Sequence, residues 1–427
     1  MFNQSGLSLD QAPPISVIFR FFFSGTLFGI SAGLLVLIFK TTIFNAYSAE
    51  ALILTHTLTL GVMLSFMFAA LFQMLPVIAG VTLTSPLKKA NFLQYPFTLG
   101  VITLLLAFYF STPWLFVASS LLLSSSILYI STIMLKNILK LENHSNSSRG
   151  MLVALLSLIV VIFLALYLTS TLGGAIEGTY YTQIKTAHYS FGLFGWIALL
   201  IISISFQTIE MFYVTPPYPK LVSQHLPFTL FGLLVISTIV SFFIPNIWAI
   251  SNILLAIVLS GYALLTLKRL TQRKRPLTDA TVWFWRLGLI SLILSMLSMT
   301  ITLFTDIQAF KTVSYILFAS FALSIVFAMF YKIVPFLTWF HLNSQGYFTA
   351  PMMHEIVHPK TAMKHLYIHL TTIVTFMLSI VVSELLYLAG VLTILSFGWM
   401  AYQIIHAYTL YNHTQKTGQK MDMGSIG

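Results

Sequence analysis

Two histidines lie near the ends of long apolar segments, in the stretches "LTHTLTLG" (54–61) and "TAHYSFG" (186–192). An imidazole inside a membrane is costly unless it is paired or ligated, so His56 and His188 are candidates for a functional site. The neutral ring is also an axial ligand of haem iron and a common metal ligand. The two residues therefore predict haem or metal ligation, with a hydrogen-bonded structural role as the alternative.

Small residues follow the second histidine. Gly192 and Gly195 come four and seven positions after His188, so a regular α-helix would place all three residues on one side. A flat macrocycle bound by the histidine would need such free space. Close packing of two membrane helices needs it as well, and both interpretations remain open at this point.

Three methionines follow the first histidine. Met63, Met67 and Met74 come 7, 11 and 18 positions after His56, which at about 100° per residue puts them within roughly 20° of one helical stripe. Methionines in this place can serve as soft copper or haem ligands. Adaptable packing in a hydrophobic core is the alternative, and it is the interpretation that we favour.

Two lysines and a tyrosine accompany the expected site. Lys185 precedes His188 by three positions, and Lys311 precedes Tyr315 by four. Either lysine could form charge-assisted hydrogen bonds with an anionic group, or extend to the membrane interface. Tyr315 could hydrogen-bond a ligand, or belong to the ordinary belt of interfacial aromatic residues.

Three polar residues suggest a different function. Glu210 lies in an apolar segment, where a carboxylate indicates a proton or cation path, and Gln207 could share a polar network with it. Together with Gln73, these side chains predict the alternative function of a transporter for a small solute or metal ion. An interfacial position of Glu210 near the cytoplasmic end of its helix is the simpler explanation.

The stretch "MHEIVHP" (353–359) contains His354, Glu355 and His358 at the spacing of zinc proteases. Pro359 disfavours helical geometry at the residue before it, so the two histidines are not expected one turn apart on a single helix. We therefore expect a cytoplasmic loop rather than catalytic zinc, and leave open whether the loop binds a metal.

Composition defines the class of protein that must position these residues. The chain has 427 residues, of which 58% are hydrophobic and 7% charged, and its mean hydropathy is +0.92. These values predict an all-α polytopic membrane protein embedded in a lipid bilayer. The absence of cysteine excludes disulfides, iron–sulfur clusters and thiolate zinc sites. The net charge of +11 indicates positive cytoplasmic loops, not nucleic-acid binding.

Twelve apolar runs have about the length that a bilayer core demands. They lie near 16–40, 51–79, 93–110, 113–136, 151–172, 187–214, 227–244, 246–267, 282–304, 312–338, 366–387 and 389–410. Lysine and arginine concentrate in the loops on the N-terminal side, above all in "KRLTQRKRPLTD" (268–279). This asymmetry predicts cytoplasmic termini and one transmembrane domain over residues 1–427.

The second, sixth and tenth runs end alike, with an aromatic residue followed by proline. The three endings are "ALFQMLPVIAG" (70–80), "IEMFYVTPPYP" (209–219) and "AMFYKIVPFLTWF" (328–340). Because these helices are four apart, the repeats run the same way across the membrane. We predict three pseudo-equivalent four-helix arcs, at roughly 15–140, 150–270 and 280–410.

The repeat also relates the candidate site residues to one another. His56 lies 20 residues before Pro76, and Tyr315 lies 20 residues before Pro335. His188 has the equivalent depth in the sixth helix. The three arcs therefore present His, His and Tyr at matching positions near the outer surface.

This organisation resembles the main subunit of haem–copper oxidases, in which the second, sixth and tenth helices are pseudo-threefold equivalents. The resemblance covers the whole chain in topology. In it, His56 matches the haem ligand of the second helix and His188 matches the histidine of the sixth. The chain is most similar to a divergent, non-oxidase branch of this superfamily, of which the NnrS-like nitric-oxide-response family is the nearest.

The sequence differs from the oxidase pattern at the positions of the copper ligands, and this difference limits the function that the resemblance implies. The expected helices at 227–244 and 312–338 contain no histidine, so a copper site and an oxygen-reducing centre are not expected. The resemblance implies a haem b near the outer face, held by His56, His188 or both, with its propionates met by Lys185 or Lys311.

The resemblance also implies a setting for that haem. We expect haem handling, electron transfer or a response to nitric oxide or oxygen in the bacterial inner membrane, beside a redox or respiratory-chain partner. So apolar a surface also suits a homo-oligomer. Besides the transporter named above, a structural or assembly subunit of a respiratory complex is a further alternative.

Overall fold

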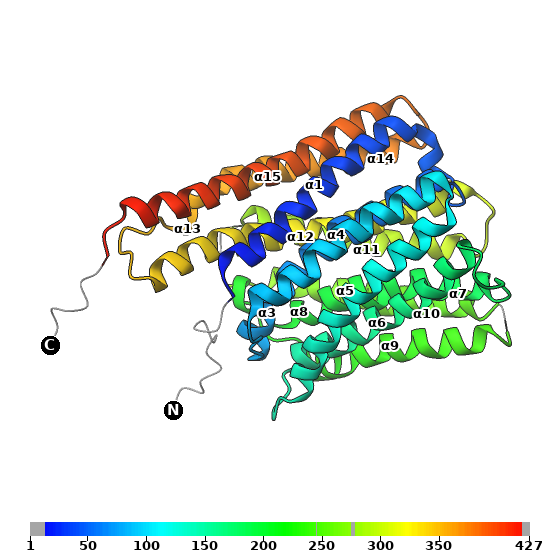
Figure 1. Ribbon diagram of the computed structural model, residues 1–427, viewed down its shortest axis with the longest axis horizontal. Coiled ribbons are helices and arrows are strands. Elements are labelled where there is room, and N and C mark those ends of the chain that lie inside the picture. Colours follow the sequence, from blue (N-terminus) through cyan, green and yellow to red (C-terminus); the bar gives the residue numbers. More distant parts are fainter. Residues whose placement is uncertain (1–12, 245, 275–277, 421–427) are drawn as a thin grey trace.

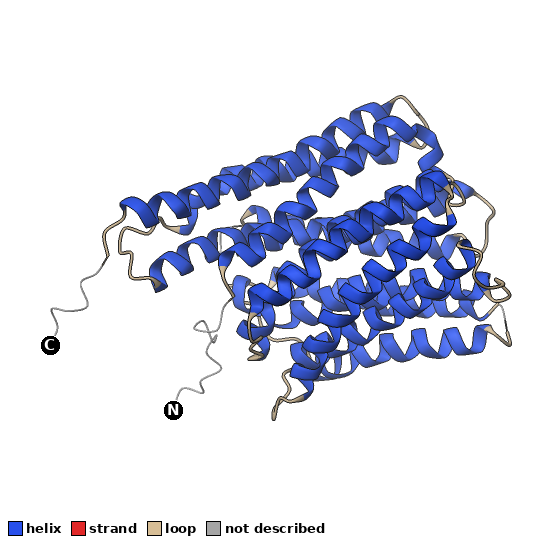
Figure 2. Cartoon of the chain, in the orientation of Figure 1, coloured by secondary structure: helices blue, strands red, loops and turns tan. Residues whose placement is uncertain are grey.

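The computed structural model describes residues 13–244, 246–274 and 278–420, and helices joined by short loops make up most of them (Figure 2). The two terminal segments and part of the basic run 268–279 thus lie outside the described residues. The helices are α1 (Ile15–Phe39), η2 (Lys40–Phe44), α2 (Ala49–His56), η3 (Thr57–Leu64), α3 (Ser65–Ala79), α4 (Pro86–Phe110), α5 (Pro113–Leu139), α6 (Asn146–Leu172), α7 (Tyr181–Ser190), η4 (Phe191–Ala198), α8 (Leu199–Tyr213), α9 (Lys220–Ser241), α10 (Ile247–Thr271), α11 (Ala280–Ile301), α12 (Gln308–Ser344), α13 (Met353–Ile356), α14 (Pro359–Ser379) and α15 (Leu385–Thr417).

Eleven helical stretches of the described chain are long and apolar enough to cross a membrane. Large apolar side chains such as Leu121 and Ile236, which are 65% and 62% exposed, cover their outer surfaces. Such surfaces are stable against lipid and not against water, so the chain is a multi-pass membrane protein. Each of these stretches overlaps one of the apolar runs found in the sequence.

The expected helix at 366–387 is the one that differs most from the structure. It is replaced by α14, which is not among the eleven apolar stretches and begins seven residues earlier, at Pro359. Proline suits the first turn of a helix, and the side chain of His358 accepts a hydrogen bond from the backbone N–H of Lys360, 3.2 Å away. The expected start at residue 366 was therefore wrong.

Three spans form the interior of the bundle. In the most apolar parts of Ala49–Ala79, Tyr181–Tyr213 and Gln308–Ser344, 83%, 78% and 61% of the residues are buried, against 50% or less in the other eight spans. These are the second, sixth and tenth runs of the sequence, which carry the shared proline endings. Burial on most sides explains why these three runs are apolar all round.

Aromatic pairs join the three interior spans to one another. Phe66 of α3 lies 6.5 Å from Phe330 of α12 between ring centroids, and Phe194 of η4 lies 5.6 Å from Phe318 of α12. Phe68 of α3 lies 6.3 Å from Trp196 of η4. Each pair lies within the range of favourable aromatic contacts, so the interior spans form a closed triangle of contacts.

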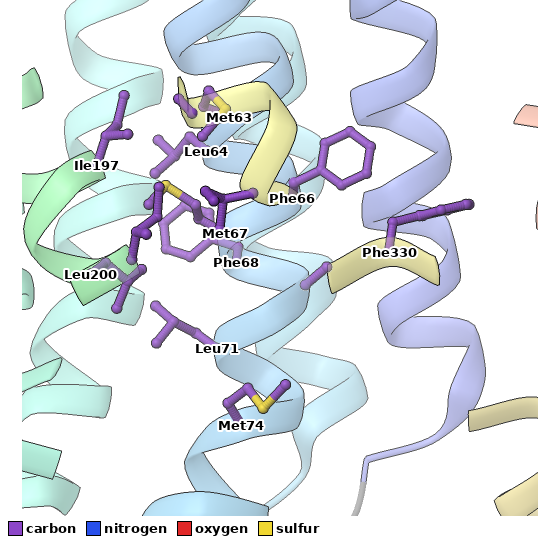
Figure 3. Close-up of a cluster of buried hydrophobic side chains, with 14 of the residues drawn as sticks. Met63, Leu64, Phe66, Met67, Phe68, Leu71, Met74, Ile197, Leu200 and Phe330 are labelled. Carbon is purple, nitrogen blue, oxygen red and sulfur yellow. The ribbon is translucent and has the colours of Figure 1, made fainter. Parts of the chain in front are cut away.

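Methionines fill part of this interior. Met63, Met67 and Met74 are 3%, 4% and 4% exposed, and they lie in a cluster of apolar side chains together with Ile197 and Leu200 (Figure 3). Flexible thioethers are well suited to irregular gaps between helices. The surroundings of these methionines agree with the packing interpretation.

The first and last helices close the bundle. α1 packs along α15, and the described chain enters α1 and leaves α15 at the same end of the bundle (Figure 1). The contact depends on glycine: a Cβ atom at Gly29 would lie 2.2 Å from the Phe397 ring, and one at Gly33 would lie 2.8 Å from the carbonyl oxygen of Gly390. The two backbones therefore approach so closely that only glycine fits.

An ion pair fixes the start of α11 against α12. Asp279 accepts a hydrogen bond from the backbone N–H of Val282 at 3.1 Å, which caps the helix. Its other oxygen lies 2.6 Å from Nζ of Lys332. Burial alone would raise the pKa of Asp279, but the charge of Lys332 and these hydrogen bonds outweigh burial, so the pKa is lowered.

We expect Asp279→Asn to lower the melting temperature only slightly, because asparagine keeps the cap and loses an ion pair worth about 1 kcal/mol or less. Asp279→Ala removes the cap as well, at a further cost of about 1 kcal/mol. Since folding lowers the pKa of Asp279, its contribution is present above the unfolded value of about 3.9 and disappears as the pH falls through the folded pKa. Melting curves in detergent at about pH 7 and about pH 3 measure this contribution. If the Asp279→Asn and Asp279→Ala variants melted at the same temperature, a capping role of Asp279 would be ruled out.

Candidate functional site

The structure brings His56 and His188 together. Their ring centroids are 6.5 Å apart, and the ring planes are inclined by 20°. His56 is the last residue of α2, and His188 lies in the last turn of α7. Both side chains are partly buried, and the Phe108 ring of α4 lies 5.0 Å from that of His56. Two residues far apart in the sequence thus form a nearly parallel pair of imidazoles.

Backbone carbonyls determine which nitrogen of each ring is free. Nδ1 of His56 lies 2.8 Å from the Leu52 oxygen, and Nδ1 of His188 lies 3.3 Å from the Val161 oxygen of α6. A carbonyl can only accept, so each Nδ1 carries the proton and each Nε2 keeps its lone pair. A carbonyl bound to the far nitrogen is the usual support of a metal-ligating histidine.

Both histidines precede a π-helical segment. The segment η3 (Thr57–Leu64) follows His56 directly, and η4 (Phe191–Ala198) begins three residues after His188. Stretches of π-helix are rare and are found frequently at functional sites. The same irregularity thus recurs beside both histidines, on the second and the sixth apolar run.

The π-helical geometry separates the two glycines. A Cβ atom at Gly195 would lie 3.0 Å from Oγ of Ser157 and 3.1 Å from Leu234, whereas one at Gly192 would meet no atom within 4 Å. A π-helical turn takes more residues than an α-helical turn, so the expected single face for both glycines does not hold. Gly195 serves helix packing, and only Gly192 borders open space.

The two lysines of the predicted site converge on one aromatic ring. Nζ of Lys185 lies 5.3 Å, and Nζ of Lys311 5.5 Å, from the ring centroid of Tyr47, within reach of cation–π attraction. Tyr47 precedes α2 and is 77% exposed, and Tyr315, one turn after Lys311, is 48% exposed. Positive charge and tyrosines therefore gather close to His188. Nothing in the sequence pointed to Tyr47.

The polar residues of the transporter alternative do not meet. Oε1 of Glu210 accepts a hydrogen bond from the backbone N–H of Tyr218 at 3.1 Å, which ties the end of α8 to the following loop. Gln73 is 3% exposed, and both polar atoms of its side chain lack a partner in the described chain. Gln207 is partly buried. No hydrogen bond among the described residues links the three side chains.

The two histidines of the "HEIVH" stretch lie on different elements. His354 belongs to the single turn α13, Val357 is extended, and His358 precedes α14 with a ψ of 138°. This agrees with the expected effect of the following proline. In the part of the chain that the structure describes, no three His, Cys, Asp or Glu residues are grouped closely enough to hold a metal ion.

A second buried pair of histidines follows the "HEIVH" stretch, and the sequence suggested its members only as further metal ligands of that stretch. His365 and His369 are 0% and 4% exposed, and their Nε2 atoms lie 2.7 Å from Oγ of Ser396 and 2.9 Å from Oγ of Ser324. The expected helix at 366–387 excluded His365. Their spacing of four residues was the available signal. The two bonds attach α14 to α15 and to α12.

Comparison with protein-family models and with curated protein sequences identifies no relative of this chain. The oxidase-like resemblance therefore depends on the order of the helices and on the histidines alone, and the function has to be argued from the geometry of the site.

Proposed function

We propose that this protein is a haem-binding integral membrane protein in which His56 and His188 hold a b-type haem. The observation that carries the proposal is the pair of nearly parallel rings, whose centroids are 6.5 Å apart and whose Nε2 atoms have no hydrogen-bond partner among the described residues. Imidazole nitrogens bind metal ions at about 2.0–2.1 Å, so two rings that share one metal ion have centroids roughly 6 Å apart. The donor set and its spacing therefore suit a single iron.

The surroundings of the pair suit the rest of the haem group. Open space borders Gly192, and Lys185 and Lys311 can donate charge-assisted hydrogen bonds to its carboxylates. Tyr47, which both lysines contact, and Tyr315 are exposed. A haem held by both histidines would supply one-electron chemistry, which the protein controls through the two imidazoles and the polar surroundings. A response to a diatomic gas would require one of the two histidines to leave the iron.

We further propose that α14 is a twelfth membrane span, so that the chain forms three pseudo-equivalent four-helix arcs with both termini cytoplasmic. α14 has 21 residues, enough for a bilayer core, and it contacts α11, α12 and α15. In this arrangement the three most buried spans are the second helices of the three arcs, and the two π-helical segments lie in the second helices of the first two arcs. An even number of spans also fits the described chain, which enters α1 and leaves α15 at the same end of the bundle (Figure 1).

The physiological role that follows is haem handling, electron transfer or a response to nitric oxide or oxygen in a bacterial inner membrane. A redox or respiratory-chain protein would be the partner, and self-association is compatible with so apolar a surface. Oxygen reduction is not part of the proposal, because the histidines of α9 and α12, His225 and His341, lie near the start of α9 and the end of α12, at the opposite ends of these helices from the depth of His56 and His188.

The proposal is tested by the absorption spectrum of the protein, purified in detergent from cells supplied with haem. We expect a Soret band and a pyridine haemochrome of haem b at about one haem per chain. Gly192→Leu should lower the haem content without unfolding the protein, because it fills the open space and leaves both histidines in place. Absence of a Soret band after haem supplementation would refute the proposal.

The transporter alternative is distinguished by uptake assays in vesicles. Because Glu210 binds the backbone of a loop, a haem protein should retain its spectrum in the Glu210→Gln variant. A proton-coupled carrier should instead lose transport in the same variant. Solute uptake that disappears in Glu210→Gln, from a protein without haem, would replace the haem proposal with the carrier.

A further inference from the structure

A second polar site lies between α1 and α4, near the beginning of both helices. It is a groove of about 470 Å³, lined by Arg20, Ser24, Gln94, Tyr95, Thr98, Leu99 and Ile102. None of these residues belongs to the His56–His188 site, and Arg20 is the one charged side chain among them.

The guanidinium of Arg20 is only partly satisfied. Nη1 donates to Oδ1 of Asn91, while Nε and Nη2 have no partner among the described residues. Nε and Nη2 lie on one edge of the planar group, the edge that binds a phosphate or carboxylate through two parallel hydrogen bonds. Protein atoms cover both nitrogens in this conformation, so a rotation of the terminal side-chain bonds is needed to turn that edge into the groove.

The described residues provide no anion for this edge. The one ion pair of the described chain joins Lys332 to Asp279, and the amide of Gln94 donates to Oγ of Ser24 at 2.8 Å and to the Arg20 carbonyl at 3.2 Å. An unpaired charge in a membrane helix is costly. An anionic group from outside the chain would therefore stabilise this site.

The position of the groove indicates which anion it takes. Arg20 lies five residues into α1, about 8 Å from the helix start, where a span meets the lipid headgroups. Further along α4, Leu99 and Ile102 are 55% and 44% exposed, so the groove continues as an apolar surface toward the membrane interior. Polar groups followed by exposed apolar side chains match the order of phosphate and acyl chain in a phospholipid.

We propose that this groove binds an anionic phospholipid, with Arg20 on the headgroup phosphate and the acyl chain along Leu99 and Ile102. Tyr95, which is 67% exposed beside the arginine, would meet the headgroup at the interface. Free phosphate would use only the polar end of the groove, so the two sources of the same group can be separated by experiment.

The test is native mass spectrometry of the full chain after exchange into phosphatidylcholine nanodiscs that contain increasing amounts of phosphatidylglycerol. We expect one retained phosphatidylglycerol per chain. Arg20→Gln should reduce this retention about tenfold, since a charge-assisted bidentate contact is worth at least about 1.4 kcal/mol. Arg149→Gln removes the same charge from an exposed position in the first turn of α6 and should have no effect.

A second variant keeps the proposal falsifiable if Arg20→Gln does not fold. Ile102→Trp leaves the arginine in place and fills the apolar end, so it should also reduce retention of phosphatidylglycerol. Addition of millimolar inorganic phosphate should leave the bound lipid in place. Equal retention by Arg20→Gln and Arg149→Gln, or displacement of the lipid by phosphate, would overturn the proposal.

Discussion

Replacing either His56 or His188 by alanine is expected to lower the haem content of the purified protein at least tenfold, because each ring supplies one of the two free Nε2 atoms of the proposed site. Haem that remains in a single variant should change from low-spin to high-spin absorption and gain the ability to bind carbon monoxide, since one axial position becomes vacant. The double variant should contain no haem. Optical spectra of protein purified in parallel provide the measurement.

His225→Ala is the matched control for these variants. His225 is exposed on α9, so its loss should change neither the haem content nor the spectrum. Circular dichroism and the elution volume in gel filtration show whether each variant keeps its fold. Haem content that is unchanged in the double variant would rule out His56 and His188 as the ligands.

The second large effect is expected from the contact between α1 and α15. Gly33→Leu should destabilise the protein by about 3 kcal/mol or more and reduce its yield from membranes, because the new side chain meets the backbone of Gly390 and the helices must separate. Melting temperature by fluorescence in detergent, together with the yield, measures this effect.

Gly261→Leu provides the comparison for this change. Gly261 lies in α10, and a Cβ atom there would meet nothing within 4 Å, so its replacement should be tolerated. If both variants were equally stable, the close approach of α1 and α15 would not be important for folding. The Soret band should be unaffected by Gly261→Leu, because α10 contributes no residue to the proposed site.

The sequence was sufficient to locate most of the fold, because a bilayer imposes its own length and polarity on every span. Eleven of the twelve predicted runs overlap helices that can cross a membrane. α14 was misplaced because Lys364, His365 and His369 make its first half polar. The two histidines of α14 are buried against α12 and α15 and not against lipid. Hydropathy calculated along the sequence cannot distinguish these two environments.

The candidate site was predictable in position and not in detail. The repeat spacing placed His56 and His188 at equivalent depth, and their rings are in fact close together. The π-helical segments could not be foreseen, because no pattern of residue types in them distinguishes a π-helix from an α-helix. The contact of the His188 Nδ1 atom with α6, and the contacts of both lysines with Tyr47, depend on tertiary packing.

The contact between α1 and α15 has a consequence for how the protein is made. Of these two helices α1 leaves the ribosome long before α15, so at about 5–20 residues per second the wait is roughly 20 to 75 seconds. During that time the surface of Gly29 and Gly33 lacks its final neighbour. An insertion chaperone, or lipid, has to cover it until α15 arrives. A chain that stops before Leu385 should keep this surface open and be recognised by membrane proteases, so the contact with α15 distinguishes a complete bundle from a truncated one.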